Sequence, residues 1–215
     1  MNSASSRFDR DGYAIVDPLL SEKAVAEISA HLQSLGQGEE RTRTLLSYDW
    51  CIALTNRLKI EPRIRSLLVD DAVGVQCTYL PKTENDNWKI GLHRDFFVPV
   101  RHRLDAPGWS GWSQKEGMLF VRPPVEVLEK LVAVRVHLEE NTMQNGPLLV
   151  VPSSHSQAEI TDPRVVCCIP SGGALAMRPL LLHASSKVES GARRVLHFVF
   201  GPRVLPHGQE WANAV

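Results

Sequence analysis

Three residues of this sequence could together bind a metal ion. His93 and Asp95 are two positions apart, and on an extended segment alternate side chains leave the same face. An imidazole and a carboxylate at this spacing can therefore contact one ion from a single strand. His183 ends the apolar run ALAMRPLLLH (174–183) and offers a third ligand. Two histidines and one carboxylate, with other coordination positions open, form the facial arrangement of non-haem Fe(II) sites.

Two arginines follow His183 in the run RRVLHFVFG (193–201), which we expect to pair antiparallel with the run that ends at His183. Strand alternation places Arg193 and Arg194 on opposite faces. The face of Arg194 is the bulkier and more hydrophobic one and carries Leu196, Phe198 and Phe200. We therefore expect Arg194 to point into a packed barrel, where a buried guanidinium needs an anion such as a dicarboxylate. The alternative is that both arginines extend into solvent.

The elements that position these residues fall into two parts. Residues 1–72 are predicted to be mostly helical, with helices over 23–35, 50–58 and 62–68; Ser21 suits the N-cap of the first. From residue 73 onward, short β-rich runs separated by turn residues indicate a barrel or sandwich. The segment from about 97 to 130 interrupts them as a long, irregular insertion, and such insertions usually serve as lids or binding loops.

Four motifs also occur in a fixed order along the chain: FDRDGYAIVDPLLS (8–21), His93-x-Asp95, NGPLLVVPSSHS (145–156) and His183-Ala-Ser185 with Arg194 eleven residues after the histidine. This ordered set resembles the phytanoyl-CoA dioxygenase family of Fe(II)/2-oxoglutarate oxygenases over nearly the whole chain. Two departures stand out. Ser153 replaces the glycine of the family's Pro-Gly-Ser-His segment, and the insertion cannot be aligned.

The resemblance implies a role for each site residue. The Fe(II) ligands would be His93, Asp95 and His183. The C5 carboxylate of 2-oxoglutarate would be bound by Arg194 with the hydroxyl of Ser185. Gln76 and Lys82 match polar family positions near the co-substrate or substrate. Halogenating relatives replace the carboxylate ligand with a small residue, so the presence of Asp95 favours hydroxylation or a related C–H oxidation of a small metabolite, with O2 consumed and succinate and CO2 released.

The fold that follows is mainly β (α+β): a double-stranded β-helix, or jelly-roll and cupin-like barrel, with the N-terminal helices packed outside. We expect one domain over residues 1–215, with the barrel core at 73–203. Two other classes stay open. A cupin-like metalloenzyme without 2-oxoglutarate would not need Arg194 to face inward. A non-catalytic barrel that binds a small ligand would not need the histidines and the aspartate to converge.

The remaining polar and aromatic residues have competing interpretations. His137 is solvated or lines a polar pocket, and we expect the solvated position. His197 is predicted to lie outside the barrel, and His155 to make a structural hydrogen bond. Trp109 and Trp112 could cover a substrate or anchor the insertion. A basic cluster beside the metal motif suggests a substrate carboxylate, although a solvated loop would look the same; it comprises Arg94, Arg101, His102 and Arg103.

Composition excludes several classes of partner. The 215 residues include 24 Lys+Arg and 24 Asp+Glu, so the formal charge is zero, and 43% are hydrophobic. These values predict a folded, soluble protein that does not bind nucleic acid. No run approaches the ~20 apolar residues of a membrane helix, and the N-terminus does not resemble a secretory signal. The four cysteines fit no disulfide or zinc pattern, so we expect a cytoplasmic protein. We also expect a monomer or a weak homo-oligomer.

Overall fold

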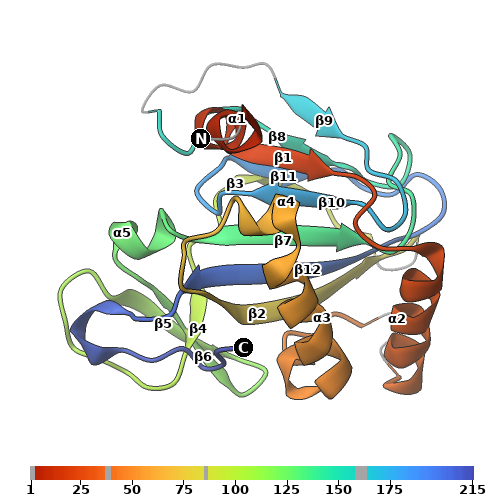
Figure 1. Ribbon diagram of the computed structural model, residues 1–215. Helices are drawn as coiled ribbons and strands as arrows, with labels where there is room; N and C mark the ends of the chain where they lie inside the picture. Colours follow the sequence, from red (N-terminus) through yellow and green to blue (C-terminus); the bar gives the residue numbers. More distant parts are fainter. Residues whose placement is uncertain (1–2, 37–39, 85–86, 158–163) are drawn as a thin grey trace.

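The computed structural model describes residues 3–36, 40–84, 87–157 and 164–215 (Figure 1). The helices are α1 (Ser3–Asp11), α2 (Glu22–Ser34), α3 (Asp49–Ile60), α4 (Pro62–Arg65) and α5 (Val125–Leu128), and short 3-10 turns lie at Leu45–Ser47 and Pro206–Gly208. The strands are β1 (Tyr13–Val16), β2 (Ala72–Lys82), β3 (Ile90–His93), β4 (Val98–Val100), β5 (Ser110–Lys115), β6 (Met118–Arg122), β7 (Val132–His137), β8 (Leu148–Val150), β9 (Val165–Cys167), β10 (Ala174–Met177), β11 (His183–Ser185) and β12 (Arg193–Pro202). Within these ranges, the helices are too short or too polar to cross a membrane.

Two antiparallel sheets form the barrel. The larger has the strand order β1-β10-β7-β12-β2, and the smaller has the order β3-β11-β8-β9. A cavity between them is lined from both sides, by Thr78 and His197 of the larger sheet and by Leu148 and His183 of the smaller one. The prediction of a mainly β jelly roll is therefore confirmed.

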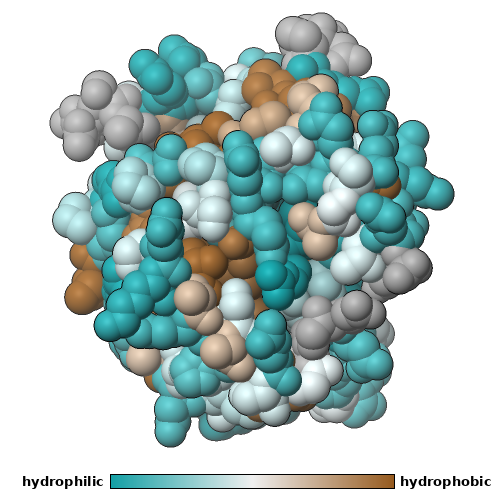
Figure 2. All heavy atoms as spheres, turned by 90° about the vertical axis from the view of Figure 1, so that its right-hand side faces the viewer, coloured by the Kyte–Doolittle hydropathy of each residue, from teal (hydrophilic) through white to brown (hydrophobic). Residues whose placement is uncertain are grey.

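The N-terminal helices lie against the outer face of the larger sheet, as predicted (Figure 1). Helix α2 begins where the Oγ of Ser21 accepts a hydrogen bond from the backbone N–H of Ala24 at 3.3 Å. Val25, Ile28 and Leu32 then form its buried stripe. The surface seen from the right-hand side of Figure 1 is mostly hydrophilic, with hydrophobic side chains showing in recesses between polar ones (Figure 2). The apolar residues of the helices are thus used to cover the sheet.

Strand β12 separates the hydrophobic core from the cavity. Its residues Leu196, Phe198 and Phe200 belong to the core beneath the helices. Its residues Arg193, His197 and Val199 line the cavity on the opposite face. The prediction that the bulkier face points into the barrel is therefore wrong. Large apolar side chains are stabilised where they leave water, and here the dry interface is the one between sheet and helices.

The run 174–183 forms two strands in different sheets. Strand β10 ends at Met177 in the larger sheet, and β11 starts at His183 in the smaller one. Pro179 lies between them and cannot donate to a strand ladder. The predicted pairing of the His183 strand with the arginine strand is wrong, since β11 pairs with β3 and β8, and β12 pairs with β2 and β7.

The insertion is more regular than its sequence suggested. It contains α5 and a three-stranded sheet with the order β4-β6-β5. Glu116 and Gly117 form the tight turn between β5 and β6 with φ values of 50° and 77°, as two-residue hairpins require. The insertion contributes Phe97, Lys115 and Phe120 to the cavity wall.

The core beneath the helices should be sensitive to truncation. Phe198 is 0% exposed, and we expect Phe198→Ala to lower the free energy of unfolding by about 3–5 kcal/mol, because the surrounding residues cannot fill the space of the lost ring. Urea unfolding measures this change. Val204 is 76% exposed, so Val204→Ala is the control and should change stability by less than about 0.5 kcal/mol. Equal effects of the two substitutions would contradict this assignment of the core.

Candidate metal centre

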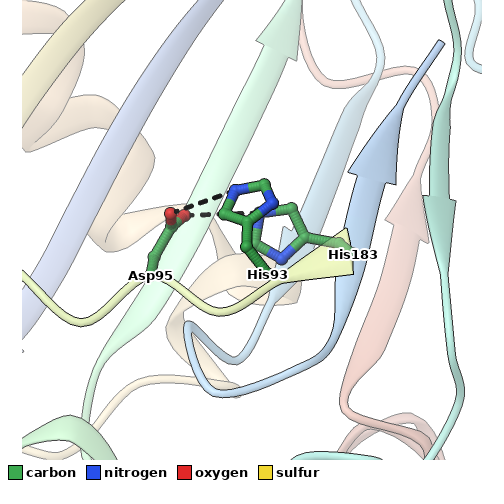
Figure 3. A group of neighbouring side chains, drawn as sticks. All are labelled: His93, Asp95 and His183. Carbon is green, nitrogen blue, oxygen red and sulfur yellow. Dashed lines mark ion pairs between the residues drawn. The ribbon is translucent and has the colours of Figure 1, made fainter. Parts of the chain in front are cut away.

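His93, Asp95 and His183 meet at one wall of the cavity (Figure 3). His93 ends β3 and lies directly opposite His183 in the pairing of β3 with β11, and Asp95 follows two residues after His93. The Nε2 of His93 is 3.7 Å from Oδ1 of Asp95, and the Nε2 of His183 is 3.5 Å from Oδ2. All ligand atoms lie within 4.8 Å of one another. The structure thus brings the three predicted residues together.

Backbone carbonyls hold both imidazole rings. The Nδ1 of His93 is 2.9 Å from the carbonyl oxygen of Gly91, and the Nδ1 of His183 is 2.9 Å from that of Leu181. If each Nδ1–H donates, each Nε2 presents its lone pair toward Asp95, which is the usual arrangement of metal-binding histidines. Burial also lowers the pKa of His183 to about 4, so this ring is neutral near pH 7. Two imidazoles and one carboxylate fit a divalent iron ion.

The cavity beside these residues has a volume of about 300 Å³ and an excess of positive charge. Its cationic lining residues are Arg41, Arg43, Arg94, Lys115, Arg135 and Arg193. Asp95 is the single carboxylate among the lining residues that the structure describes. The remaining wall is largely apolar and includes Leu80, Trp88, Ile90, Phe96, Phe97 and Phe120. An anion with an apolar portion suits such a space.

Two arginines lie buried in the cavity wall. Arg193 is 3% exposed and donates from Nη1 to the carbonyl of Gly146; Arg135 is 6% exposed, with Nη1 3.2 Å from Nδ1 of His197. In the described part of the chain, the Nε of each has no hydrogen-bond partner and no carboxylate forms an ion pair with either. Burial, together with the charge of Arg135, lowers the pKa of Arg193 to about 9. A buried, unpaired guanidinium is costly, so these groups are suited to binding an anion.

Arg194 does not reach this cavity. It pairs with the carboxylate of Glu139, which also accepts a hydrogen bond from the backbone N–H of Arg194 at 2.7 Å. The prediction that Arg194 points inward is therefore wrong, and Arg193 takes that position. A shift of one residue exchanges the two faces of a strand.

Of the other predicted co-substrate residues, Ser185 and Lys82 lie near Arg193, and Gln76 lies farther along β2, opposite Val199. Ser185 lines the cavity, and its Oγ accepts a hydrogen bond from the Nζ of Lys82 at 2.8 Å. Lys82 is 0% exposed and also donates to the carbonyl of Ser186 at 2.7 Å. Because the Ser185 oxygen accepts from Lys82, its own hydrogen can be donated into the cavity. Gln76 lines the cavity as well, and its Nε2 donates to Oγ1 of Thr78 at 2.7 Å.

Two histidines occupy positions other than those expected. His137 is 1% exposed rather than solvated, and neither ring nitrogen has a hydrogen-bond partner among the described residues. His197 is 7% exposed and lines the cavity rather than the outside of the barrel. Burial lowers the pKa of both rings, that of His197 to about 3. His155 fulfils its prediction, since its Nε2 lies 3.1 Å from the carbonyl oxygen of Asp9.

Of the basic cluster beside the metal motif, Arg94 alone is among the described residues that line the cavity. Arg94 donates to the carbonyls of Leu180 and Ser154 at 2.7 and 2.8 Å. Arg101 pairs with Glu210 at 2.6 Å, and the guanidinium of Arg103 lies 5.8 Å from the ring centre of Trp112.

The two insertion tryptophans anchor the insertion rather than cover the cavity. Trp109 is 7% exposed within the second hydrophobic core, and Trp112 packs against that core. Neither is among the residues that line the cavity.

Lys82 gives the protein a pH dependence of known sign. Burial, with the charges of Arg193 and Arg135, lowers its pKa from 10.5 to about 7. Between these two values the unfolded chain binds more protons than the folded one, so stability rises with pH. We expect the wild type to gain free energy of unfolding relative to Lys82→Met between pH 7 and pH 9.5, measured by urea unfolding at both. A constant difference would show that Lys82 is not buried as a titrating amine.

Comparisons with known proteins agree with this geometry. SnoN, a non-haem α-ketoglutarate-dependent epimerase from nogalamycin biosynthesis, is 18% identical with a TM-score of 0.69, over 93% of this chain and 79% of that one. HygX from Streptomyces hygroscopicus, solved with nickel and 2-oxoglutarate bound, is 15% identical with a TM-score of 0.64, over 94% and 87%. EctD from S. alaskensis is 18% identical with a TM-score of 0.68, over 94% and 77%. At these identities the likeness shows the fold.

A family model gives the more specific result. No curated protein sequence matches the chain. The model of the phytanoyl-CoA dioxygenase family matches residues 8–196, which is most of its length. The chain therefore belongs to the phytanoyl-CoA dioxygenase family and is a non-haem iron enzyme that depends on 2-oxoglutarate.

Proposed function

We propose that the protein hydroxylates a C–H bond of a small organic molecule. Bound Fe(II), 2-oxoglutarate and O2 supply the oxidising chemistry, with release of succinate and CO2. His93, Asp95 and His183 would hold the ion, and all three side chains line the cavity. Asp95 supports hydroxylation over halogenation, since a carboxylate occupies the position that a halide would need.

The observation that carries this proposal is the buried guanidinium of Arg193, whose Nε lacks a partner among the described residues. We assign Arg193 to the C5 carboxylate of 2-oxoglutarate, since its planar fork matches a carboxylate. The Ser185 hydroxyl donates to the same carboxylate and is itself positioned by Lys82. Arg135 adds a second buried positive charge, which favours an anion in this part of the cavity.

A small-molecule substrate matches the cavity of about 300 Å³. SnoN has been solved in complex with Fe3+, α-ketoglutarate and nogalamycin RO, so that enzyme binds a small molecule. We propose the same class for this chain, without its identity. The unpaired cysteines support our proposal that the protein works in the cytoplasm. We also propose that it is a monomer or a weak homo-oligomer.

An anaerobic titration tests the proposal. Fe(II) followed by 2-oxoglutarate should produce a visible charge-transfer band, and admission of O2 should then yield succinate. Metal binding without a band would favour a metalloenzyme that does not use 2-oxoglutarate. A protein that binds no metal would be a non-catalytic ligand-binding barrel, and the proposal would be wrong.

A further inference from the structure

The cavity has a second cationic region, formed by segments far apart in the sequence. Arg41 and Arg43 come from the segment before α3, and Lys115 ends strand β5 of the insertion. The segment is fixed along β2, because the backbone N–H of Tyr79 donates to the carbonyl of Thr42 at 2.8 Å. Strand β2 stands between this segment and β12, which carries Arg193. The segment and Arg193 therefore lie on opposite sides of β2, although the charge of Arg41 still acts on Arg135.

Glu116 joins the two sides of this region. Its carboxylate pairs with the guanidinium of Arg43 and accepts a hydrogen bond from the backbone N–H of Arg43 at 2.6 Å. It also accepts from the hydroxyl of Thr42 at 3.2 Å. The charge of Arg43 is therefore already compensated, and its role is to hold the β5–β6 turn against the segment.

The side chains of Arg41 and Lys115 are not neutralised by a direct ion pair. Within the ranges that the structure describes, neither side chain forms an ion pair or a hydrogen bond, although Glu116 and Asp95 lie near enough to Arg41 to act on it electrostatically. The ammonium of Lys115 lies 5.3 Å from the ring centre of Phe97 and 5.4 Å from that of Phe120. Although Arg41 remains solvent-accessible, burial and the neighbouring charge of Arg43 lower its pKa. Two like charges held at one cavity edge favour a shared anion.

We propose that Arg41 and Lys115 bind an anionic oxygen group of the substrate, a carboxylate in the simplest case. The apolar body of that molecule lies against Phe97 and Phe120, which flank Lys115. This places the anionic end at the Arg41 edge of the cavity and leaves a C–H bond of the body to face His93, Asp95 and His183. The inference names the substrate class of the proposed hydroxylase and rests on that function.

Matched pairs of organic acids and their primary amides test the charge requirement. The Fe(II)-loaded protein is held anaerobically with saturating 2-oxoglutarate, so that the acids cannot occupy the Arg193 site. Binding is followed by changes in the charge-transfer band and by tryptophan fluorescence, since Trp88 lines the cavity. Acids should bind, and their amides should bind about 10-fold more weakly or worse. A panel in which no acid binds at millimolar concentration, or in which amides bind equally well, would overturn the proposal.

Two variants assign the site. Arg41→Gln and Lys115→Gln should each raise the dissociation constant of the best acid about 10-fold or more, with the affinity for 2-oxoglutarate unchanged. Arg101→Gln is the matched control, because it removes one positive charge from the same insertion at an exposed ion pair. Unchanged acid affinity in both variants would contradict the assignment.

The two readouts also separate this inference from the proposed function. If the charge-transfer band never forms but acids quench tryptophan fluorescence in an Arg41-dependent manner, the anion site stands and the 2-oxoglutarate chemistry fails. If the charge-transfer band forms normally but no acid binds, the 2-oxoglutarate chemistry stands and the anion site fails.

Discussion

Asp95→Ala should abolish Fe(II)-dependent turnover of 2-oxoglutarate. The substitution removes the one carboxylate among the described lining residues and leaves two imidazoles in a cavity lined by cations. Loss of residues that merely orient metal ligands typically costs 10–100-fold in affinity or activity, so loss of the ligand itself should exceed about 100-fold. Anaerobic Fe(II) titration measures the loss of metal affinity, and succinate formation measures the loss of activity.

Asp105→Ala is the control for this experiment. Asp105 is an exposed carboxylate in the insertion that follows Asp95, and its removal should leave Fe(II) affinity and succinate formation unchanged. Circular dichroism and urea unfolding of both variants separate loss of the metal from loss of the fold. Wild-type Fe(II) affinity in a folded Asp95→Ala protein would show that the three residues do not form the metal site.

Arg193→Gln is expected to weaken 2-oxoglutarate binding about 100-fold or more, whereas Arg194→Gln should leave it unchanged. Truncating one partner of a buried charge pair costs roughly 2–5 kcal/mol, and each 1.4 kcal/mol is about tenfold in affinity. Arg194 instead pairs with Glu139 outside the cavity, where both side chains are about one quarter exposed. Its loss should lower stability by only about 1 kcal/mol. The charge-transfer band titrated with 2-oxoglutarate measures the affinities.

The comparison of adjacent arginines controls for charge and for sequence position at once. Arg193→Lys should lie between the wild type and Arg193→Gln, because an ammonium keeps the charge but loses the planar fork. If Arg194→Gln abolished co-substrate binding and Arg193→Gln did not, the strand would have to present its other face to the cavity in solution.

Several features could be predicted because they depend on residues that are close together in the sequence. Ser21 and the buried stripe of α2 obey helix rules that need no tertiary information, and His93 and Asp95 carry their spacing in the chain itself. The convergence of His183 with them depends on the pairing of β11 with β3, which the resemblance implied but the residue pattern alone did not.

The face of β12 could not be assigned from bulk alone. An assignment from bulk assumes that the most hydrophobic face of a strand points into the barrel. Here the helices cover the outer face, and charged side chains line the cavity. Arg135 carried a usable signal, since it is a lone cation between valines in a strand that is buried throughout. Arg41 and Lys115 carried none, because their proximity arises from contacts such as that of Glu116 with Arg43, 73 positions apart.

Ser153 stands where the resembling family has the glycine of its Pro-Gly-Ser-His segment. It has φ of 64°, a left-handed conformation that glycine adopts without strain and other residues do not. The glycine that the resembling family has at this position suits this conformation better than serine does.

The alternation along β12 has an evolutionary consequence. Positions that shape the ligand environment and positions that hold sheet to helices occupy different faces of the same strand. Substitutions that retune selectivity can therefore accumulate at every second residue without eroding the packing on which folding depends. A scaffold divided in this way can change its substrate within one lineage, and laboratory evolution of this chain would do best to confine its libraries to the cavity-facing positions.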